Sequence, residues 1–421
     1  MDIFFRADAS VHIGTGHIMR CMVLASILKR QGHHVTFISR RLNGHMADDL
    51  KRRGLDVRLL ACPSKHSQPS HSADYAAWLQ VSEKEDANEF IQTVKKADLV
   101  VLDHYAIGMA WEEMIVSDLA CKILVIDDLL RQHTFDLLLD QNLGRTNNDY
   151  LDSPKSDRNK RLMGCEYALL YPDFARIRSS IQDVKTSTHR LMVFLGGFDK
   201  DNITLEVLKA LSISDLSRVK SISVIVKESA PHHKVVKAFV DANSSKFSLH
   251  GFVKDMAEFM ARHTIAIGAA GTNSWERACL GLPSIVIPIA ENQLDIAKNL
   301  LKSNLALAVS AKNIAGEIPL ALAKLCSNHK KMKLSCMLAC DGLGAYRTAF
   351  YVNQLFRKES GYFDGCRLAT ESDTDQVFAW QLKPETRRYA NNPEKPSYNQ
   401  HKKWMKKKLE SVHDYFYIIE A

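Results

Sequence analysis

Gly14-Thr15-Gly16-His17-Ile18-Met19-Arg20 follows the short apolar run Ile3-Phe4-Phe5 and opens a long stretch with helical periodicity. An apolar strand, a glycine turn and a helix in this order predict the first unit of a parallel α/β sheet. Glycines at the mouth of a helix let backbone N–H groups approach an anion closely. His17 stands in the first helical turn, where the helix dipole favours a neutral imidazole that can accept a proton. The stretch therefore predicts an anion site beside a candidate general base.

Strands and helices alternate along the chain in two series. The first includes strands over 99–102 and 122–126 with a helix over 109–119 between them, and the second begins at Arg190. Apolar strands separated by helices indicate parallel sheets that are covered on both faces. Polar stretches at 147–160 and 179–189 separate the series, and the latter is the better hinge candidate. We therefore expect Rossmann-like domains at 1–180 and 189–357, whose strand ends face one ligand-binding cleft.

The composition indicates a globular protein, because 46% of its 421 residues are hydrophobic and 25% are charged. A net charge of +8 fits an anionic substrate. No basic stripe with interleaved aromatic residues is present, which argues against nucleic acid as a partner. Nine cysteines without a CxxC pair favour a reducing compartment. Neither a signal sequence nor an apolar run of bilayer length is found, so we expect a cytoplasmic protein with no membrane partner.

Polar side chains gather at the predicted strand ends of the first series. Arg6 and Asp8 end the first strand, and Asp103-His104-Tyr105 ends a later one. Asp103 could orient a histidine and Tyr105 could pack on a sugar ring, with an ordinary polar loop as the competing interpretation. Arg20 shares a helical face with His17, where it could hold a phosphate, orient the base, or simply face solvent.

Two glycine turns mark the second series. Gly196-Gly197-Phe198-Asp199 follows one strand, and Gly271-Thr272 opens a helix. Their backbone N–H groups can cradle a diphosphate, and Glu276, one turn into that helix, can accept hydrogen bonds from ribose hydroxyls. Glu291-Asn292-Gln293 follows the strand over 284–288, and an ordinary helix start is the competing interpretation. Asp127-Asp128 in the first series is interpreted as a helix or turn cap, so no metal is expected.

These motifs together resemble one known family. Their order and spacing, over about residues 1–357, are similar to those of the UDP-2,4-diacetamido-2,4,6-trideoxy-β-L-altropyranose hydrolases of pseudaminic acid biosynthesis. The motifs are Arg6-Ala7-Asp8, the stretch 14–20, Asp103-His104-Tyr105, the turn 196–199 and Glu291-Asn292-Gln293. The resemblance implies a GT-B fold, similar to that of the peptidoglycan N-acetylglucosaminyltransferase. It places the sugar and the reacting water in the first domain and UDP in the second.

The resemblance also implies roles for single residues. His17 would activate water to attack the anomeric carbon, and UDP would leave with inversion and without a metal or other cofactor. Tyr105 and Asn292 would position the sugar as further catalytic residues. The substrate-binding candidates are Arg6, Asp8, Gly14, Gly16, Arg20, His104, Gly196, Gly197, Gly271, Thr272, Glu276, Glu291 and Gln293.

Residues 362–421 resemble the start of a GNAT-type N-acetyltransferase, a partial α+β fold. The glycine-rich acetyl-CoA turn of that family is expected later than this segment, so we expect no acetyl transfer from this chain. The lysine-rich run 402–408 is interpreted as a solvated helix face with Trp404 and Met405 turned inward. An anionic surface partner is the competing interpretation.

Two other functions stay open at this point. A GT-B glycosyltransferase would pass the same UDP-activated amino sugar to an acceptor, and a non-catalytic UDP-sugar-binding protein would need no base. The stereochemistry of the sugar and the oligomeric state are also open, as is contact with other enzymes of the pathway.

Overall fold

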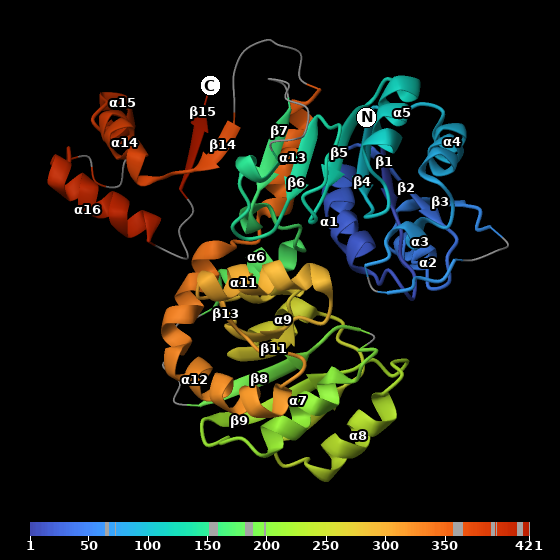
Figure 1. Ribbon diagram of the computed structural model, residues 1–421. Coiled ribbons are helices and arrows are strands. Elements are labelled where there is room, and N and C mark those ends of the chain that lie inside the picture. The colour runs from blue at the N-terminus through green and yellow to red at the C-terminus, as the bar shows by residue number, and fades with distance from the viewer. Residues whose placement is uncertain are drawn as a thin grey trace. The chain divides into compact units, whose positions relative to one another are not determined.

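The computed structural model describes residues 1–63, 67–71, 73–150, 159–181, 188–197, 199–356, 365–388, 392, 394–410 and 416–420. Phe198 and most of the predicted hinge at 179–189 lie outside these residues. The chain divides into two compact units, Met1–Leu355 and Phe356–Ala421. The first unit holds two parallel sheets, as the alternating pattern predicts (Figure 1).

The first sheet has seven strands in the order β3-β2-β1-β4-β5-β6-β7, and each neighbouring pair is parallel. Its strands are β1 (Asp2–Ala7), β2 (His34–Arg40), β3 (Asp56–Leu60), β4 (Leu99–Asp103), β5 (Lys122–Ile126), β6 (Leu137–Asp140) and β7 (Lys160–Met163). The helices are α1 (Gly16–Arg30), α2 (Ala47–Arg52), α3 (Ala76–Leu79), α4 (Glu83–Val94) and α5 (Met109–Leu119). Strand β4 is buried along its whole length, because helices cover both faces of the sheet.

The second sheet has six parallel strands in the order β10-β9-β8-β11-β12-β13. They are β8 (His189–Phe194), β9 (Val219–Ile225), β10 (Phe247–His250), β11 (Ile265–Ala269), β12 (Ser284–Ile287) and β13 (Ala306–Ala308). The helices are α7 (Ile203–Ser212), α8 (His233–Ala242), α9 (Met256–Ala261), α10 (Asn273–Cys279), α11 (Leu294–Lys302) and α12 (Ile314–Ala339). In both sheets the strand order reverses beside the first strand of the series, which is where ligands bind in doubly wound folds.

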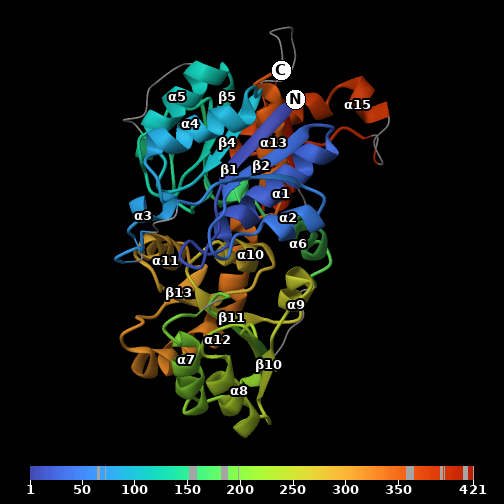
Figure 2. The same ribbon diagram turned by 90° about the vertical axis from the view of Figure 1, so that its right-hand side faces the viewer.

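Helix α13 (Gly344–Gln354) packs against α1 in the first sheet's layer, although the sequence places it within the second series (Figure 2). The Asn353 amide donates to Gln31 Oε1 at 2.9 Å, and Asn353 Oδ1 lies 2.9 Å from His33 Nε2. Only glycine fits at position 344, because a Cβ there would lie 2.3 Å from the carbonyl carbon of Tyr167. The chain therefore returns to the first sheet after it has completed the second.

Helix α6 (Pro172–Arg178) joins the two sheets. Arg178 is buried and donates to the carbonyl oxygens of Cys279, Met337 and Cys340, which close the last turns of α10 and α12. A buried guanidinium on helix C-terminal carbonyls satisfies groups that would otherwise have no partner. This contact fixes the connecting helix to the second sheet's helices.

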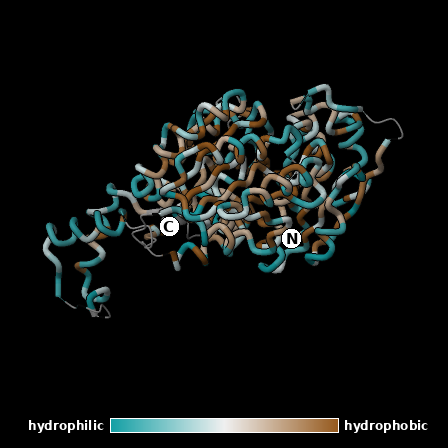
Figure 3. Tube along the Cα trace, turned by 90° about the horizontal axis from the view of Figure 1, so that it is seen from below, coloured by the Kyte–Doolittle hydropathy of each residue, from teal (hydrophilic) through white to brown (hydrophobic). Residues whose placement is uncertain are grey.

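The second unit is small. Strand β14 (Gly365–Leu368) pairs antiparallel with β15 (Tyr417–Glu420), and α14 (Thr374–Gln381), α15 (Pro384–Arg388) and α16 (Tyr398–Leu409) complete it. Met405 is buried in its apolar cluster and Trp404 packs against it, which confirms the inward orientation predicted for these side chains. Figure 3 shows mostly hydrophilic residues along these helices and apolar residues throughout the first unit. Among the described residues, no helix combines the length and apolarity that a membrane span requires.

Candidate functional site

His17 and Asp103 form a hydrogen-bonded pair at the carboxyl edge of the first sheet. Asp103 ends β4, beside Ala7 of β1, and His17 lies in the first turn of α1. His17 Nδ1 is 2.6 Å from Asp103 Oδ1. A carboxylate at Nδ1 favours the tautomer that carries its proton there, so Nε2 is the nitrogen that can accept one. None of the described residues hydrogen-bonds Nε2, and 9% of the side chain stays exposed.

Arg20 bridges two carboxylates under this pair. Its Nε lies 2.6 Å from Asp103 Oδ2, its Nη2 2.7 Å from Asp103 Oδ1, and its Nη1 2.5 Å from Asp128 Oδ2. Burial disfavours the charged form of Asp103, but Arg20 and then His17 outweigh it and hold the pKa of this carboxyl well below its usual range. The guanidinium is engaged by these carboxylates and holds Asp103 beside the imidazole of His17. Both predicted roles of Arg20, orienting the base and holding a phosphate, stay predictions.

Both the hydroxyl and the ring of Tyr105 contact neighbouring side chains. Its hydroxyl donates to Asp128 Oδ2 at 2.7 Å, and its ring meets the imidazole of His17 edge-on with centroids 4.5 Å apart. Burial and then Asp128 raise the pKa of Tyr105 well above its usual value. Asp128 is thus an anchor for Tyr105 and Arg20, which the interpretation as a cap did not foresee.

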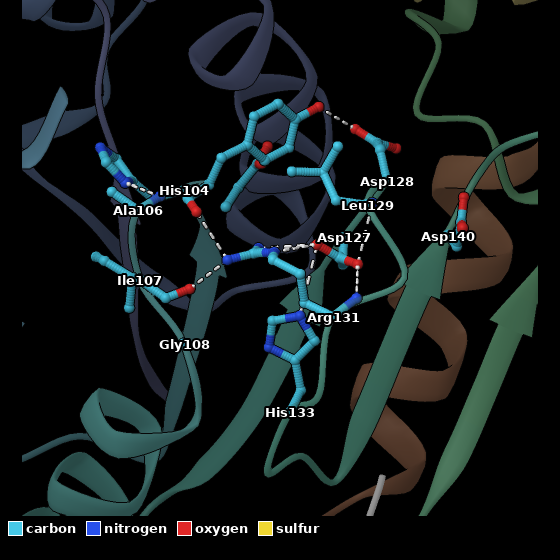
Figure 4. A network of polar contacts seen from close by, with 12 residues as sticks. His104, Ala106, Ile107, Gly108, Asp127, Asp128, Leu129, Arg131, His133 and Asp140 are labelled. Carbon is cyan, nitrogen blue, oxygen red and sulfur yellow. Dashed lines mark hydrogen bonds and ion pairs between the residues drawn. The ribbon is translucent and has the colours of Figure 1, made fainter. Parts of the chain in front are cut away.

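Asp127 is the residue that caps the turn after β5. It accepts hydrogen bonds from the backbone N–H groups of Leu129 and Arg131, both at 3.1 Å (Figure 4). The Arg131 side chain donates to the Tyr105 and Ile107 carbonyl oxygens at 2.9 and 2.7 Å. The loops that follow β4 and β5 are thereby tied together, which holds Tyr105 in place.

Arg6, Asp8 and His104, which are predicted to bind substrate, lie buried among protein groups. Arg6 is 0% exposed and pairs with Asp8 at 2.8 Å and with Asp86 at 2.7 Å. His104 Nε2 lies 3.4 Å from Asp8 Oδ2, and burial lowers the pKa of His104. Protein groups enclose all three side chains, which support the strand ends, and contact of these residues with substrate stays a prediction.

The turn before α1, where the sequence predicts an anion site, is open. Gly14 has a φ of 78°, and its N–H donates to the Ser10 carbonyl oxygen at 2.8 Å. A Cβ at Gly14 or Gly16 would meet nothing within 4 Å. The N-cap residue, Thr15, makes no side-chain cap hydrogen bond. The first N–H groups of α1 are therefore not used by a capping side chain.

In the second sheet, Gly196 and Gly197 follow β8 beside a lysine that the sequence analysis missed. Gly196 has a φ of 107°. Lys227 is exposed and follows β9. Its ammonium group lies close to Gly197, since a Cβ added to this glycine would be 3.1 Å from Lys227 Nζ. Asp199 accepts from the N–H groups of Ile203 and Thr204 at 2.9 and 3.0 Å and so caps α7. An ammonium group beside a glycine turn adds charge to the predicted diphosphate cradle.

Gly271 and Thr272 precede α10, and Glu276 lies in its first turn. The Asn273 side chain donates to Glu276 Oε2 at 2.5 Å. Burial raises the pKa of Glu276 to about 7. Because Asn273 occupies only Oε2 of Glu276, the other carboxyl oxygen, Oε1, can still accept a hydrogen bond from a ligand hydroxyl.

The neighbouring strand ends continue this edge. Gly251 follows β10, and a Cβ there would lie 3.2 Å from Glu228 Cγ at the end of β9. A pocket beside it includes His250, Phe259 and Phe252, whose side chain is 82% exposed. No motif in the sequence marked this pocket, although the aromatic residue Phe252 shortly after a predicted strand was an available signal.

Glu291-Asn292-Gln293 forms a short 3-10 helix, η3, that leads into α11, so the competing interpretation as a helix start describes its backbone. Gln293 Oε1 accepts from the Ile289 N–H at 3.1 Å. Burial raises the pKa of Tyr75, a residue in the loops of the first sheet, and the negative charge of Glu291 is the next largest cause. On the same side, a Cβ on Gly144 would lie 3.5 Å from the Asn299 side chain. The carboxyl edges of the two sheets therefore adjoin here.

Comparisons with known proteins agree with this architecture. Residues 191–339 match the glycosyltransferase family 28 C-terminal domain. MurG of Acinetobacter baumannii superposes with a TM-score of 0.59 at 14% identity, over 84% of this chain and 99% of that chain. The fold is GT-B-like.

Curated relatives that share sequence with the chain include the following two. The UDP-2,4-diacetamido-2,4,6-trideoxy-beta-L-altropyranose hydrolase of Campylobacter jejuni is 27% identical over 58% of this chain and 76% of the relative. The spore coat polysaccharide biosynthesis protein SpsG of Bacillus subtilis is 24% identical over 47% of this chain and 59% of its own length. The GNAT resemblance of the second unit stays a prediction.

Proposed function

We propose that this protein hydrolyses UDP-2,4-diacetamido-2,4,6-trideoxy-β-L-altropyranose to UDP and the free sugar, in the formation of pseudaminic acid. The observation that carries the proposal is the hydrogen bond between His17 Nδ1 and Asp103. It leaves His17 Nε2, which none of the described residues hydrogen-bonds, beside an open glycine turn. The similarity to the Campylobacter jejuni hydrolase supports the choice of substrate. A protein that only binds a UDP-sugar would not require an oriented base.

In the proposed reaction, His17 Nε2 takes a proton from a water molecule as the water oxygen attacks the anomeric carbon. The C–O bond to UDP breaks with inversion, and the electron pair leaves with the diphosphate. Asp103 stabilises the imidazolium that forms, as carboxylates do in related dyads. The N–H groups of Gly196, Gly197, Gly271 and Thr272 and the Lys227 ammonium stabilise the leaving charge. Tyr105 and Asn292 position the sugar.

The proposal is tested with purified protein and a panel of UDP-diacetamido-sugars in the absence of any acceptor. Release of UDP together with free sugar, and an inverted anomer seen first by NMR, are the expected results. UDP release that requires an added acceptor would identify a glycosyltransferase. Binding of the sugar nucleotide without release of UDP would identify a binding protein.

Lys227→Met is expected to weaken UDP binding about tenfold, because one charge-assisted contact to the diphosphate is lost. Isothermal titration with UDP and with uridine measures the effect, and uridine affinity should not change. Lys220→Met is the matched control, since Lys220 is an exposed lysine in β9, the strand that Lys227 follows. Equal losses for UDP and uridine would contradict a diphosphate contact.

UDP affinity is expected to rise about fivefold as the pH rises through 7, because a charged carboxylate accepts a ribose hydroxyl more strongly than a neutral carboxyl. Burial raises the pKa of Glu276 to about 7, so this side chain becomes charged in that range. Glu276→Gln should remove the part of the pH dependence of UDP affinity that the Glu276 carboxyl causes. The part that comes from titration of UDP itself should remain. An unchanged pH profile in the variant would show that Glu276 does not contact the ribose.

A further inference from the structure

Two aromatic rings, those of Tyr105 and Trp78, lie against the imidazole of His17, and the ring of Tyr75 packs against both. Trp78 lies on the short helix α3, and Tyr75 is the residue directly before this helix. Trp78 stacks on Tyr105 with centroids 5.8 Å apart and meets His17 edge-on at 6.3 Å. Tyr75 meets Tyr105 at 5.1 Å and Trp78 at 4.8 Å, both edge-on. We call Tyr75 and Trp78 the aromatic wall.

Local hydrogen bonds build the loop that carries the wall. The Gln80 side chain binds the Ser67 backbone on both sides, accepting from its N–H and donating to its carbonyl oxygen, each at 2.8 Å. Asp74 accepts from the Ser70 N–H at 2.9 Å. Leu79, next to Trp78, is buried in the core of the first sheet. Tyr75 and Trp78 therefore lie on an anchored segment that consists of the end of the loop after β3 and helix α3.

The wall lies near both halves of the proposed site. Trp78 is 8% exposed, and Tyr75 is more exposed than Trp78. Glu291, at the carboxyl edge of the second sheet, is close enough to raise the pKa of Tyr75. The wall thus packs on the imidazole of the proposed base, and Glu291 of the second sheet's edge lies within electrostatic range of Tyr75. A sugar attached to UDP and presented to His17 has to pass beside it.

We propose that Tyr75 and Trp78 determine sugar specificity by contacting the apolar substituents of the sugar. The inference rests on the proposed function. A 2,4-diacetamido-2,4,6-trideoxy sugar carries a methyl group at C6 and two acetyl methyl groups. Aromatic rings bury such groups favourably, whereas a hydroxyl at the same place would lose its hydration without gaining a partner. One methyl or methylene group in an apolar pocket discriminates between substrates by roughly 10–200-fold.

Alanine and phenylalanine variants test the wall. Trp78→Ala and Tyr75→Ala should raise KM for the sugar nucleotide at least about tenfold, with Kd for UDP unchanged. Trp78→Phe and Tyr75→Phe should restore most of the affinity, because each keeps a ring. Tyr346→Ala is the matched control, a substitution of a 41% exposed tyrosine on α13. Unchanged KM in both alanine variants, or an equal loss of UDP affinity, would overturn the proposal.

A binding experiment separates this inference from the proposed function. In His17→Asn protein the sugar nucleotide should bind without being cleaved. Tryptophan fluorescence should then change with the sugar nucleotide and not with UDP alone. Trp78→Phe should abolish this difference, although the chain has five tryptophans in total. If the difference survives in Trp78→Phe, the wall does not contact the sugar. If wild-type protein releases no UDP but the difference depends on Trp78, the wall stands and the hydrolase function fails.

Discussion

Replacing His17 by asparagine is expected to lower kcat by about 10²–10⁴-fold, which is the usual contribution of a general base. Asparagine can still hydrogen-bond Asp103, so the buried carboxylate keeps a partner, but it cannot take a proton from water. Kd for UDP should stay within about twofold, because the proposed UDP contacts lie on the second sheet. Stopped assays of UDP release and titration calorimetry measure the two quantities.

His34→Asn is the matched control for this substitution. His34 is an exposed histidine at the start of β2, at the opposite end of the strands from His17. It should leave kcat unchanged. Full activity in His17→Asn would contradict the proposed base, whereas loss of UDP binding together with kcat would point to a folding defect.

Asp103→Asn is expected to lower kcat by about 10²–10⁴-fold and also to lower the free energy of unfolding by about 3–5 kcal/mol. The activity falls because an amide no longer selects the His17 tautomer or stabilises its protonated form. The stability falls because Arg20, which is 5% exposed, keeps only Asp128 of the two carboxylates that compensate the burial of its charge. Urea denaturation and UDP-release assays check both effects.

The pH dependence has a definite sign. The pKa of Asp103 is lowered in the folded state, so its charged form stabilises the fold at any pH above the ordinary carboxyl range. That stability is lost as the pH falls below this range. The wild-type protein should therefore lose more stability under acid conditions than Asp103→Asn does.

Asp49→Asn is the control for stability. The Asp49 carboxylate pairs with Arg52 at the surface, where the two side chains are 47% and 74% exposed. An exposed ion pair contributes little, so the free energy of unfolding should change by no more than about 1 kcal/mol. A loss as large as that of Asp103→Asn would contradict the view that burial of the Asp103–Arg20 ion pair causes the loss.

Much of the fold follows from local sequence signals. The helix predicted over 109–119 and the strand predicted over 122–126 coincide with α5 and β5. Strand β7 was missed because Lys160-Arg161 gives it no apolar alternation, and it pairs as the last strand of its sheet. The packing of α13 on the first sheet also had no local signal, because it depends on contacts across more than 300 residues, such as the one from Asn353 to Gln31.

The candidate site divides in the same way. His17, Asp103 and Tyr105 were recognisable in the sequence, because glycine turns and polar residues after apolar strands mark the carboxyl edge of a parallel sheet. Arg6 and Arg20 look alike in the sequence. Only the tertiary structure shows that both guanidinium groups pair with buried carboxylates. Tyr75, Trp78 and Lys227 had no motif, since their significance comes from what lies beside them. Residue type and spacing are local properties of the chain, whereas burial and partnership arise when distant strands pair.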